Sequence, residues 1–379
     1  MPATPSTLIT GGAGFIGSHL ARELLRRGSA ITILDNFSPQ IHGPDADLAP
    51  DIAPHVRLVR GDVRDPDAWR LALKDIECIV HLAAQTGTGQ SMYDAHTYQQ
   101  VNIGGTAHLY DLLARDRGSV SRIVLASSRA VYGEGAYTCP LHGLVFPLSQ
   151  STAARLAGGF DPACPECSGS CSPAPTPESA PLHPSSYYGL TKQVQEQTAQ
   201  LFADSLGLAT LILRPQNVYG PGQSLTNPYT GVLALFATLA RTGAPIELFE
   251  DGLATRDFVY VDDTVRAFAN AVTSSLTGTH ISNIGSGSPT SLLDAALAIK
   301  AHFGSHSKLN VSGRFRSGDV RHALADLSAA ERLLAYVPRT SFEEGLTGFL
   351  EWSATQPAPA SDLHTSALNE LIARGLLHG

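Results

Sequence analysis

The chain has 379 residues, of which 43% are hydrophobic and 16% are charged. This composition supplies a large core and excludes an intrinsically disordered protein, and the length is typical of two or three domains. With 26 basic and 34 acidic residues the formal net charge is −8, which argues against nucleic acid or an anionic membrane as the main partner. No basic leader and no long apolar segment is seen, so we expect a soluble, cytoplasmic protein.

Short apolar runs alternate with helical patterns up to residue 213. The runs that predict buried strands cover residues 7–10, 30–34, 56–59, 78–82, 122–126 and 209–213. Helical periodicity lies between them, over residues 19–27, 67–73, 102–115 and 188–206. Such alternation is typical of a doubly wound α/β fold, a parallel sheet with helices on both faces. We therefore predict a Rossmann domain over residues 1–213.

Three other parts interrupt or follow this domain. Between residues 135 and 184 Pro, Ser, Gly and Cys dominate, which predicts an insertion. Residues 214–350 mix short strands and helices, as expected of a smaller α/β substrate-binding lobe, although residues 258–285 should return to the first domain. Residues 351–379 contain a proline-rich linker and a short helix over 362–374. Its apolar side chains, which should pack on the protein, are Leu363, Ala367, Leu368, Leu371 and Ile372.

A glycine-rich turn follows the first predicted strand, in the run TGGAGFIG over residues 10–17. Gly11, Gly14 and Gly17 permit a tight turn, a close approach of backbone amides to a pyrophosphate, and close packing of helix on strand. Taken alone, the turn also fits a plain strand–helix connection. The next strand ends at Asp35, where a carboxylate accepts hydrogen bonds from the adenosine ribose and repels a 2′-phosphate. The pair of signals predicts NAD rather than NADP.

Other residues at strand ends complete the predicted NAD site. Asp62 follows the third strand, where its carboxylate would meet the adenine amino group. The alternative is an N-cap of the next helix, a position for which Asp65 competes. The remaining residues that we assign to the cofactor are Phe15, Ile16, Asn36, Val63, Leu82, Ala83, Ala84, Asn102 and Pro215.

Ser128, Tyr188 and Lys192 form the candidate catalytic set. Ser128 follows the fifth strand, and Tyr188 and Lys192 stand four residues apart on one face of a helix. A lysine ammonium and a cationic nicotinamide ring both favour the phenolate, which brings the tyrosine pKa towards neutrality and makes Tyr188 a general base. Ser128 would hydrogen-bond the same substrate hydroxyl, and Lys192 would also bind the nicotinamide ribose. Each residue alone has an ordinary structural explanation, but the combination downstream of a dinucleotide turn predicts a catalytic site.

The insertion contains four of the five cysteines. Cys139 pairs with His142, and Cys164 with Cys167, in two Cys-x-x-ligand units about twenty residues apart. This spacing predicts a zinc-ribbon-like Cys₃His site, whose metal would supply folding energy to a segment without a core. Cys171 in place of His142 would give a four-Cys site, and unligated thiols in a loop are the further alternative. Four protein ligands leave no open position, so the zinc should be structural.

The order of these motifs resembles that of extended short-chain dehydrogenase/reductases, in particular nucleotide-sugar epimerases such as the UDP-glucose 4-epimerases, and dehydratases. The resemblance runs from residue 7 to about residue 349 and includes RPQNVYGP at 214–221, RDFVYVDD at 256–263 and RSGDVR at 316–321. It implies NAD as cofactor, a nucleoside-diphosphate sugar as substrate and a homodimer. In that family the positions of Asn217, Arg256 and Arg316 meet the diphosphate, a task that suits arginine. The other residues that we assign to the substrate are Gln85, Thr86, Ser128 and Arg129.

Arg129 and Ala130 stand where dehydratases of the family carry acidic side chains. The resemblance therefore argues against 4,6-dehydration and leaves hydride chemistry at C4. The serine motif, the runs 85–91 and 221–231 and the cysteine-bearing insert most resemble bacterial dTDP-L-rhamnose 4-epimerases, which implies conversion of dTDP-L-rhamnose to dTDP-6-deoxy-L-talose. The alternatives are a UDP-glucose or UDP-GlcNAc 4-epimerase, a nucleotide-sugar 4-keto reductase or dehydrogenase, and a non-catalytic NAD-sensing scaffold.

Overall fold

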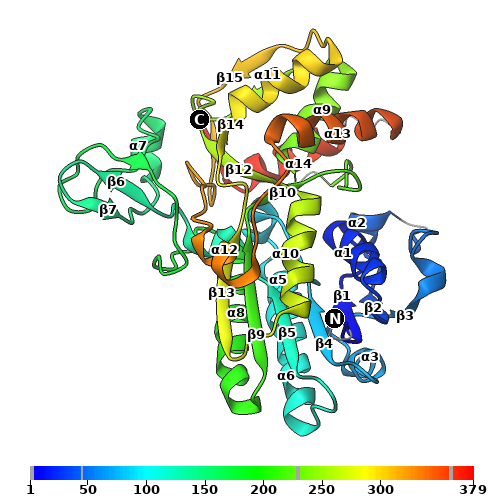
Figure 1. Cartoon of the computed structure of the whole chain (residues 1–379). Helices are drawn as coiled ribbons and strands as arrows, with labels where there is room; N and C mark the ends of the chain where they lie inside the picture. The colour runs from blue at the N-terminus through cyan, green and yellow to red at the C-terminus, as the bar shows by residue number, and fades with distance from the viewer. Residues whose placement is uncertain (1–3, 44–45, 228–230, 358–361) are drawn as a thin grey trace.

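Seven parallel strands form the central sheet of the computed structural model, which describes residues 4–43, 46–227, 231–357 and 362–379 (Figure 1). Their order is β13 (Thr279–Ile284), β9 (Ala209–Pro215), β5 (Arg122–Ala126), β4 (Cys78–His81), β1 (Thr7–Thr10), β2 (Ile31–Asp35) and β3 (Val56–Arg60). Every residue of β1, β2 and β4 is buried, because helices cover both faces of the sheet. The predicted doubly wound α/β fold is confirmed.

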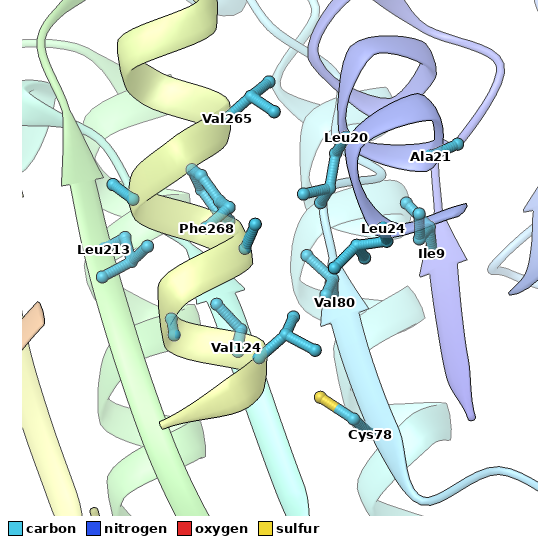
Figure 2. Close-up of a cluster of buried hydrophobic side chains, with 14 of the residues drawn as sticks. Ile9, Leu20, Ala21, Leu24, Cys78, Val80, Val124, Leu213, Val265 and Phe268 are labelled. Atoms are coloured by element: carbon cyan, nitrogen blue, oxygen red, sulfur yellow. The ribbon is translucent and has the colours of Figure 1, made fainter. Parts of the chain in front are cut away.

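The two faces of the sheet carry separate apolar cores. On one face α1 (Phe15–Arg26) and α10 (Val261–Thr273) bring Leu20, Leu24 and Phe268 against Val80 and Val124 of the strands (Figure 2). On the other face α3 (Pro66–Ala72), α6 (Gly105–Arg115) and α8 (Tyr187–Leu206) pack in a core that includes the fully buried Trp69. Each buried side chain of this size stabilises the fold by about 1.5–3 kcal/mol, so burial on both faces holds the layers together.

Three elements differ from their predicted bounds by two residues or more. β9 extends to Pro215, beyond the apolar run, because β13 pairs with it along its whole length. α1 begins at Phe15 rather than at residue 19, because the glycine turn leads directly into the helix. A π-helical segment, η2 (Gln99–Gly104), precedes α6 where we predicted regular helix from residue 102.

A smaller unit is built mainly from the chain after β9. It contains the sheet β10 (Asn217–Tyr219), β12 (Thr255–Tyr260) and β14 (Pro289–Ser291), the strand pair β11 (Ile246–Leu248) and β15 (Leu309–Val311), and the helices α9 (Val232–Thr242), α11 (Leu292–Phe303) and α13 (Phe342–Thr355). These elements share a core around Phe236, Phe258 and Phe349. The chain leaves this unit to place α10 and β13 on the large sheet, and again where α12 (Ser328–Leu334) packs against them.

The insertion has more structure than its composition suggests. Strands β7 (Gly143–Val145), β6 (Tyr137–Cys139) and β8 (Ser172–Pro173) form an antiparallel sheet, and α7 (Thr152–Leu156) follows β7. This unit projects from the body of the protein on the left of Figure 1. None of the helices in the described residues is both long and apolar enough to cross a membrane.

The C-terminal segment packs on a short strand at residues 315–316 and against Gly89 and Tyr93, which follow β4. Helix α14 (Asp362–Ala373) leads to β17 (Leu377–His378), which pairs antiparallel with β16 (Phe315–Arg316). On the predicted apolar face of α14, Leu371 is buried and lies next to Gly89. Ile372 is 49% exposed, because it stands about 100° further round the helix. The side chains of Leu363 and Ala367 lie outside the described residues.

Candidate active site

A cavity of about 840 Å³ lies between the carboxyl ends of the central strands and the smaller unit. The residues of the predicted site that line it are Gly11, Gly14, Phe15, Ile16, Gly17, Asp35, Asn36, Val63, Leu82, Ala83, Ala84, Gln85, Thr86, Ser128, Arg129, Tyr188, Lys192, Pro215, Asn217, Arg256 and Arg316. The structure thus brings together side chains from elements that lie far apart in the chain. Asp62 and Asn102 do not line it.

The glycine turn fits a pyrophosphate. Gly11 has φ of +69°, and a Cβ on it would lie 2.9 Å from the backbone nitrogen of Ala83. A Cβ on Gly17 would lie 2.2 Å from the Gly11 carbonyl oxygen. Gly14 is the N-cap of α1 and offers no side chain to the first turn, which also has no acidic residue. The first N–H groups of α1 are therefore left for an anion in the cavity.

The carboxylate of Asp35 stands beside this turn. It accepts hydrogen bonds from the backbone N–H of Ala13 at 3.0 Å and of Phe37 at 2.9 Å, and the residue is 6% exposed. Each carboxylate oxygen has two lone pairs, so further donors such as ribose hydroxyls can still bind. These features fit NAD, because a buried carboxylate at this point would repel a 2′-phosphate.

Asp62 and Asn102 do not line the cavity, so their assignment to the cofactor stays a prediction. The carboxylate of Asp62 accepts from the guanidinium of Arg64 at 2.8 Å and from the amide of Asn36 at 2.7 Å, and both of these partners line the cavity. Partial burial raises the pKa of Asp62, but the hydrogen bonds from Arg64 and Asn36 outweigh this effect and lower the pKa to about 2. The alternative N-cap role falls to Asp65, which accepts from the backbone of α3.

Asn102 is fully buried behind the cavity wall. Its side chain accepts from the backbone N–H of Gln85 at 2.7 Å and donates to the hydroxyl of Thr191 at 2.9 Å. It thereby ties the loop after β4 to α8, one residue before Lys192. This position suits a residue that holds the loop after β4 and α8 in place better than one that contacts the cofactor directly.

Ser128, Tyr188 and Lys192 meet where α8 packs on the short helix η3 (Arg129–Tyr132). Ser128 caps η3, and Tyr188 is the second residue of α8. A Cβ on Gly189 would lie 2.4 Å from the carbonyl oxygen of Ala130, so only glycine allows this contact. Ser128 and Tyr188 both line the cavity beside this contact, and the Ser128 hydroxyl lowers the pKa of the Tyr188 phenol. The Lys192 ammonium donates to the Ala126 carbonyl at 2.8 Å.

The charges around Tyr188 differ from our prediction. Burial raises the Tyr188 pKa above its ordinary value, opposed by the hydrogen bond with Ser128 and the positive charge of Arg129. Burial also lowers the Lys192 pKa to about 7, and Glu196 only partly offsets this. Lys192 is therefore only partly charged near neutral pH. The positive charge of Arg129 therefore favours the phenolate, in addition to the effect predicted for Lys192.

A buried ion pair supports the catalytic helix from behind. Both carboxylate oxygens of Glu196, one turn after Lys192, accept from the Arg214 guanidinium, at 2.8 and 2.6 Å. Ser127 donates to the same carboxylate, and Arg214 also donates to the Tyr132 hydroxyl at 2.7 Å. The arginine of the 214–221 motif therefore holds α8, η3 and β9 together.

Several polar groups in the substrate half of the cavity have no protein partner. Among the described residues the Arg129 guanidinium makes no hydrogen bond or ion pair, and burial, followed by the nearby Arg256, lowers its pKa to about 10. The side-chain oxygens of Gln216 and Asn217 are buried without a donor in the described part of the chain, and both residues line the cavity. Buried polar groups normally find partners, so these are suited to hydroxyls or phosphates of a ligand.

Two predicted diphosphate residues already have protein partners. The Arg256 guanidinium donates to backbone carbonyls of Thr255, Val320 and Arg321. Arg316 donates through Nε to Asp319 at 2.8 Å. Both still line the cavity, and these bonds fix where their remaining N–H groups can point.

The cysteine-bearing insert brings four potential metal ligands together. The ligand atoms of Cys139, His142, Cys164 and Cys167 all lie within 4.8 Å of one another. The His142 Nδ1 atom is 3.6 Å from the Cys139 sulfur and 3.5 Å from that of Cys164, and the sulfurs of Cys139 and Cys167 are 3.8 Å apart. Tetrahedral zinc with bonds of about 2.3 Å to sulfur and 2.0 Å to nitrogen would set these separations at about 3.8 and 3.5 Å. Cys171 is not in this described cluster.

The sequence analysis missed some residues of the cavity wall. Arg155 of the insert and Leu368 of α14 both line it, from segments in which we named no residue for NAD or the substrate. Arg155 stands in a segment without periodicity or motif, so no pattern pointed to it. Gln216 lies inside the 214–221 motif, beside Asn217, and that position was the available signal.

The chain belongs to the NAD dependent epimerase/dehydratase family, whose model matches residues 7–151 and 165–285. A dTDP-L-rhamnose 4-epimerase of Burkholderia thailandensis is 42% identical over 357 residues, which cover 92% of this chain and 95% of that protein. A putative UDP-glucose 4-epimerase of Methanocaldococcus jannaschii is 30% identical, with 91% and 97% covered. The solved UDP-glucose 4-epimerase of Thermus thermophilus in complex with NAD matches with a TM-score of 0.74 at 27% identity, over 93% of this chain and 100% of that one. The predicted class, an NAD-dependent nucleotide-sugar epimerase, is confirmed.

Proposed function

We propose that the protein inverts C4 of dTDP-L-rhamnose to give dTDP-6-deoxy-L-talose. The observation that carries this proposal is the meeting of Ser128, Tyr188 and Lys192 on the wall of a cavity that also holds the glycine turn and Arg129. The absence of acidic residues directly after Ser128 supports hydride chemistry without dehydration. The similarity to the Burkholderia thailandensis enzyme favours L-rhamnose over D-glucose or N-acetylglucosamine.

The roles of the residues follow from their positions. Bound NAD supplies the hydride acceptor for C4 and the donor for its return. Tyr188 takes the proton of the C4 hydroxyl and later gives it back, while Ser128 holds the same oxygen through its hydroxyl. Arg129 favours the phenolate form of Tyr188. Lys192 holds the ribose, and Asn217, Arg256 and Arg316 hold the diphosphate while the hexose turns over.

The reaction without added cofactor tests the proposal. Purified protein incubated with dTDP-L-rhamnose should give its 4-epimer with no change in total NADH, and UDP-glucose and UDP-GlcNAc should react more slowly. Product identification and the NAD content of the protein are the measurements. A 4-keto sugar formed in proportion to NADH would contradict an epimerase and favour the dehydrogenase alternative. A protein that binds NAD but converts none of the three sugars would favour the scaffold alternative.

We also propose that the four-residue cluster of the insert holds a structural zinc ion. The separations of Cys139, His142, Cys164 and Cys167 support His142, rather than Cys171, as the fourth ligand. The small buried cluster of the insert, which includes Tyr137 and Val145, is too small to stabilise it alone. Four protein ligands would exclude a catalytic role for the metal.

Elemental analysis should find about one zinc per chain. Cys164→Ser should lose the metal and open residues 135–184 to protease while the large sheet stays folded, because that sheet has its own cores. Cys171→Ser is the matched control and should keep the metal. Metal-free wild-type protein with a protease-resistant insert would contradict the zinc site, and metal loss in Cys171→Ser would contradict the choice of His142.

We propose that the protein has three parts. They are an NAD-binding domain of residues 1–213 with segment 258–285, a substrate-binding lobe over most of 214–350, and the C-terminal segment 351–379.

We also propose a homodimer and a cytoplasmic location. The homodimer is supported by Leu190 and Leu201, which are 42% and 72% exposed on α8. A cytoplasmic location is supported by the five unpaired cysteines.

A further inference from the structure

The insert contributes one charged side chain to the active-site cavity. Arg155, in α7, lines the cavity, and its side chain is only 9% exposed. Burying an arginine is unfavourable unless its donors and its charge are matched. The partners of Arg155 therefore indicate what it holds in place.

Arg155 and the smaller unit share one buried carboxylate. Glu250 accepts from Arg155 at 2.5 Å through one oxygen and from Arg321 at 2.9 Å through the other. Arg321 also donates to Asp161 of the insert at 2.7 Å. The insert is thus fastened to the wall of the cavity by two ion pairs, one from Arg155 to Glu250 and one from Asp161 to Arg321.

The remaining contacts of Arg155 are with β16, the strand that carries Arg316. The Arg155 guanidinium carbon lies 4.2 Å from the centre of the Phe315 ring, and one terminal nitrogen is 3.5 Å from the Arg316 carbonyl oxygen. Both β16 residues line the cavity. Within the described chain, the one strand that pairs with β16 is β17. β16 is two residues long, and the backbone just before it is hydrogen-bonded to that of Glu250, the residue whose carboxylate Arg155 holds.

We infer that Arg155 is a positioning residue for the nucleoside diphosphate, which it serves by fixing β16 so that Arg316 faces the phosphates. The inference rests on the proposed function, since it needs a diphosphate at Arg316. Asp319 orients the guanidinium of Arg316, and Arg155 fixes the backbone of the same residue through its carbonyl oxygen. The insert is then a wall of the substrate site as well as a metal-binding unit.

Substitution of Arg155 tests this role in the full-length protein. Arg155→Met removes the charge and the fork but keeps much of the side chain's length. We expect it to raise the KM for dTDP-L-rhamnose and the Kd for dTDP by about tenfold, with kcat within about twofold of wild type, because only binding at the phosphates is weakened. Arg155→Lys should recover part of the affinity, since the charge returns without the planar fork. NAD content should match wild type.

Leu156→Ala, at the next position of α7, is the control. Leu156 is 60% exposed and does not line the cavity, so dTDP affinity and KM should not change. Unchanged dTDP affinity in Arg155→Met would overturn the inference, as would a loss of kcat with KM unchanged. Titration of dTDP does not depend on turnover. If the proposed reaction is wrong, the wild type binds dTDP without forming product, whereas if the role of Arg155 is wrong, product forms and the affinities are equal.

Discussion

Tyr188→Phe should lower kcat by at least the ~10²–10⁴-fold that a general base contributes, while NAD stays bound. The substitution removes one hydroxyl and leaves the aromatic ring, which lies edge-on to Tyr98 with centroids 6.4 Å apart. The glycine turn, Asp35 and Lys192 are unchanged. The measurements are the rate of C4 epimerisation and the NAD content of the purified protein.

Tyr187→Phe provides the matched control for this experiment. Tyr187 is the first residue of α8, immediately before Tyr188, and does not line the cavity. The same chemical change one position earlier should leave kcat close to that of wild type. Substantial turnover by Tyr188→Phe would show that another group takes the proton, and equal losses in both variants would indicate a defect of the helix instead.

Glu196→Gln should lower the free energy of unfolding by about 3–5 kcal/mol, as is typical when one partner of a buried ion pair is removed. The side chains of Arg214 and Glu196 are 2% and 0% exposed. Glutamine keeps the shape of glutamate but leaves the guanidinium of Arg214 buried without a counter-charge. Denaturant unfolding of the NAD-loaded protein is the measurement.

The exposed pair of Arg22 and Asp51 is the control for that measurement. It has the same two-bond geometry, at 2.6 and 3.1 Å, but its side chains are 40% and 57% exposed. Water screens such a pair, so Asp51→Asn should change the free energy of unfolding by only about 0.2–1 kcal/mol. Similar losses in the two variants would contradict the special importance of the buried pair.

The sequence predicted the central sheet well because burial on both faces leaves a plain signal. Continuous apolar runs mark β1, β2 and β4. Residues at or just after their ends reach the cavity, because parallel strands place their carboxyl ends along one edge. Long-range pairing could not be predicted from local patterns. β9 extends to Pro215 only because β13 lies beside it, where Pro215 is in register with Ile284.

The site residues could be predicted where a sequence motif contains the reacting side chains. They could not be predicted where a side chain reaches the site, or changes the pKa of a site residue, only through tertiary packing. The Asp62 carboxylate accepts from Arg64, two residues later, and the sequence spacing alone does not establish that contact. The pKa of Tyr188 depends on burial and on Arg129, and neither effect could be weighed without the packing. Arg155 reaches the cavity only through the docking of the insert, which no local pattern announces.

The position of β13 at the end of the large sheet affects how the protein folds during its synthesis on the ribosome. β9 completes its own segment at Pro215, but its partner β13 ends at Ile284, after much of the smaller unit has been made. At about 5–20 residues per second, the gap of about 70 residues takes about 4–14 s to synthesise. Until then β9 is an apolar edge strand with unpaired backbone groups, of the kind to which another strand can add. The nascent chain therefore passes through a period in which its sheet is open to wrong partners, and this period closes only when residue 284 has left the ribosome.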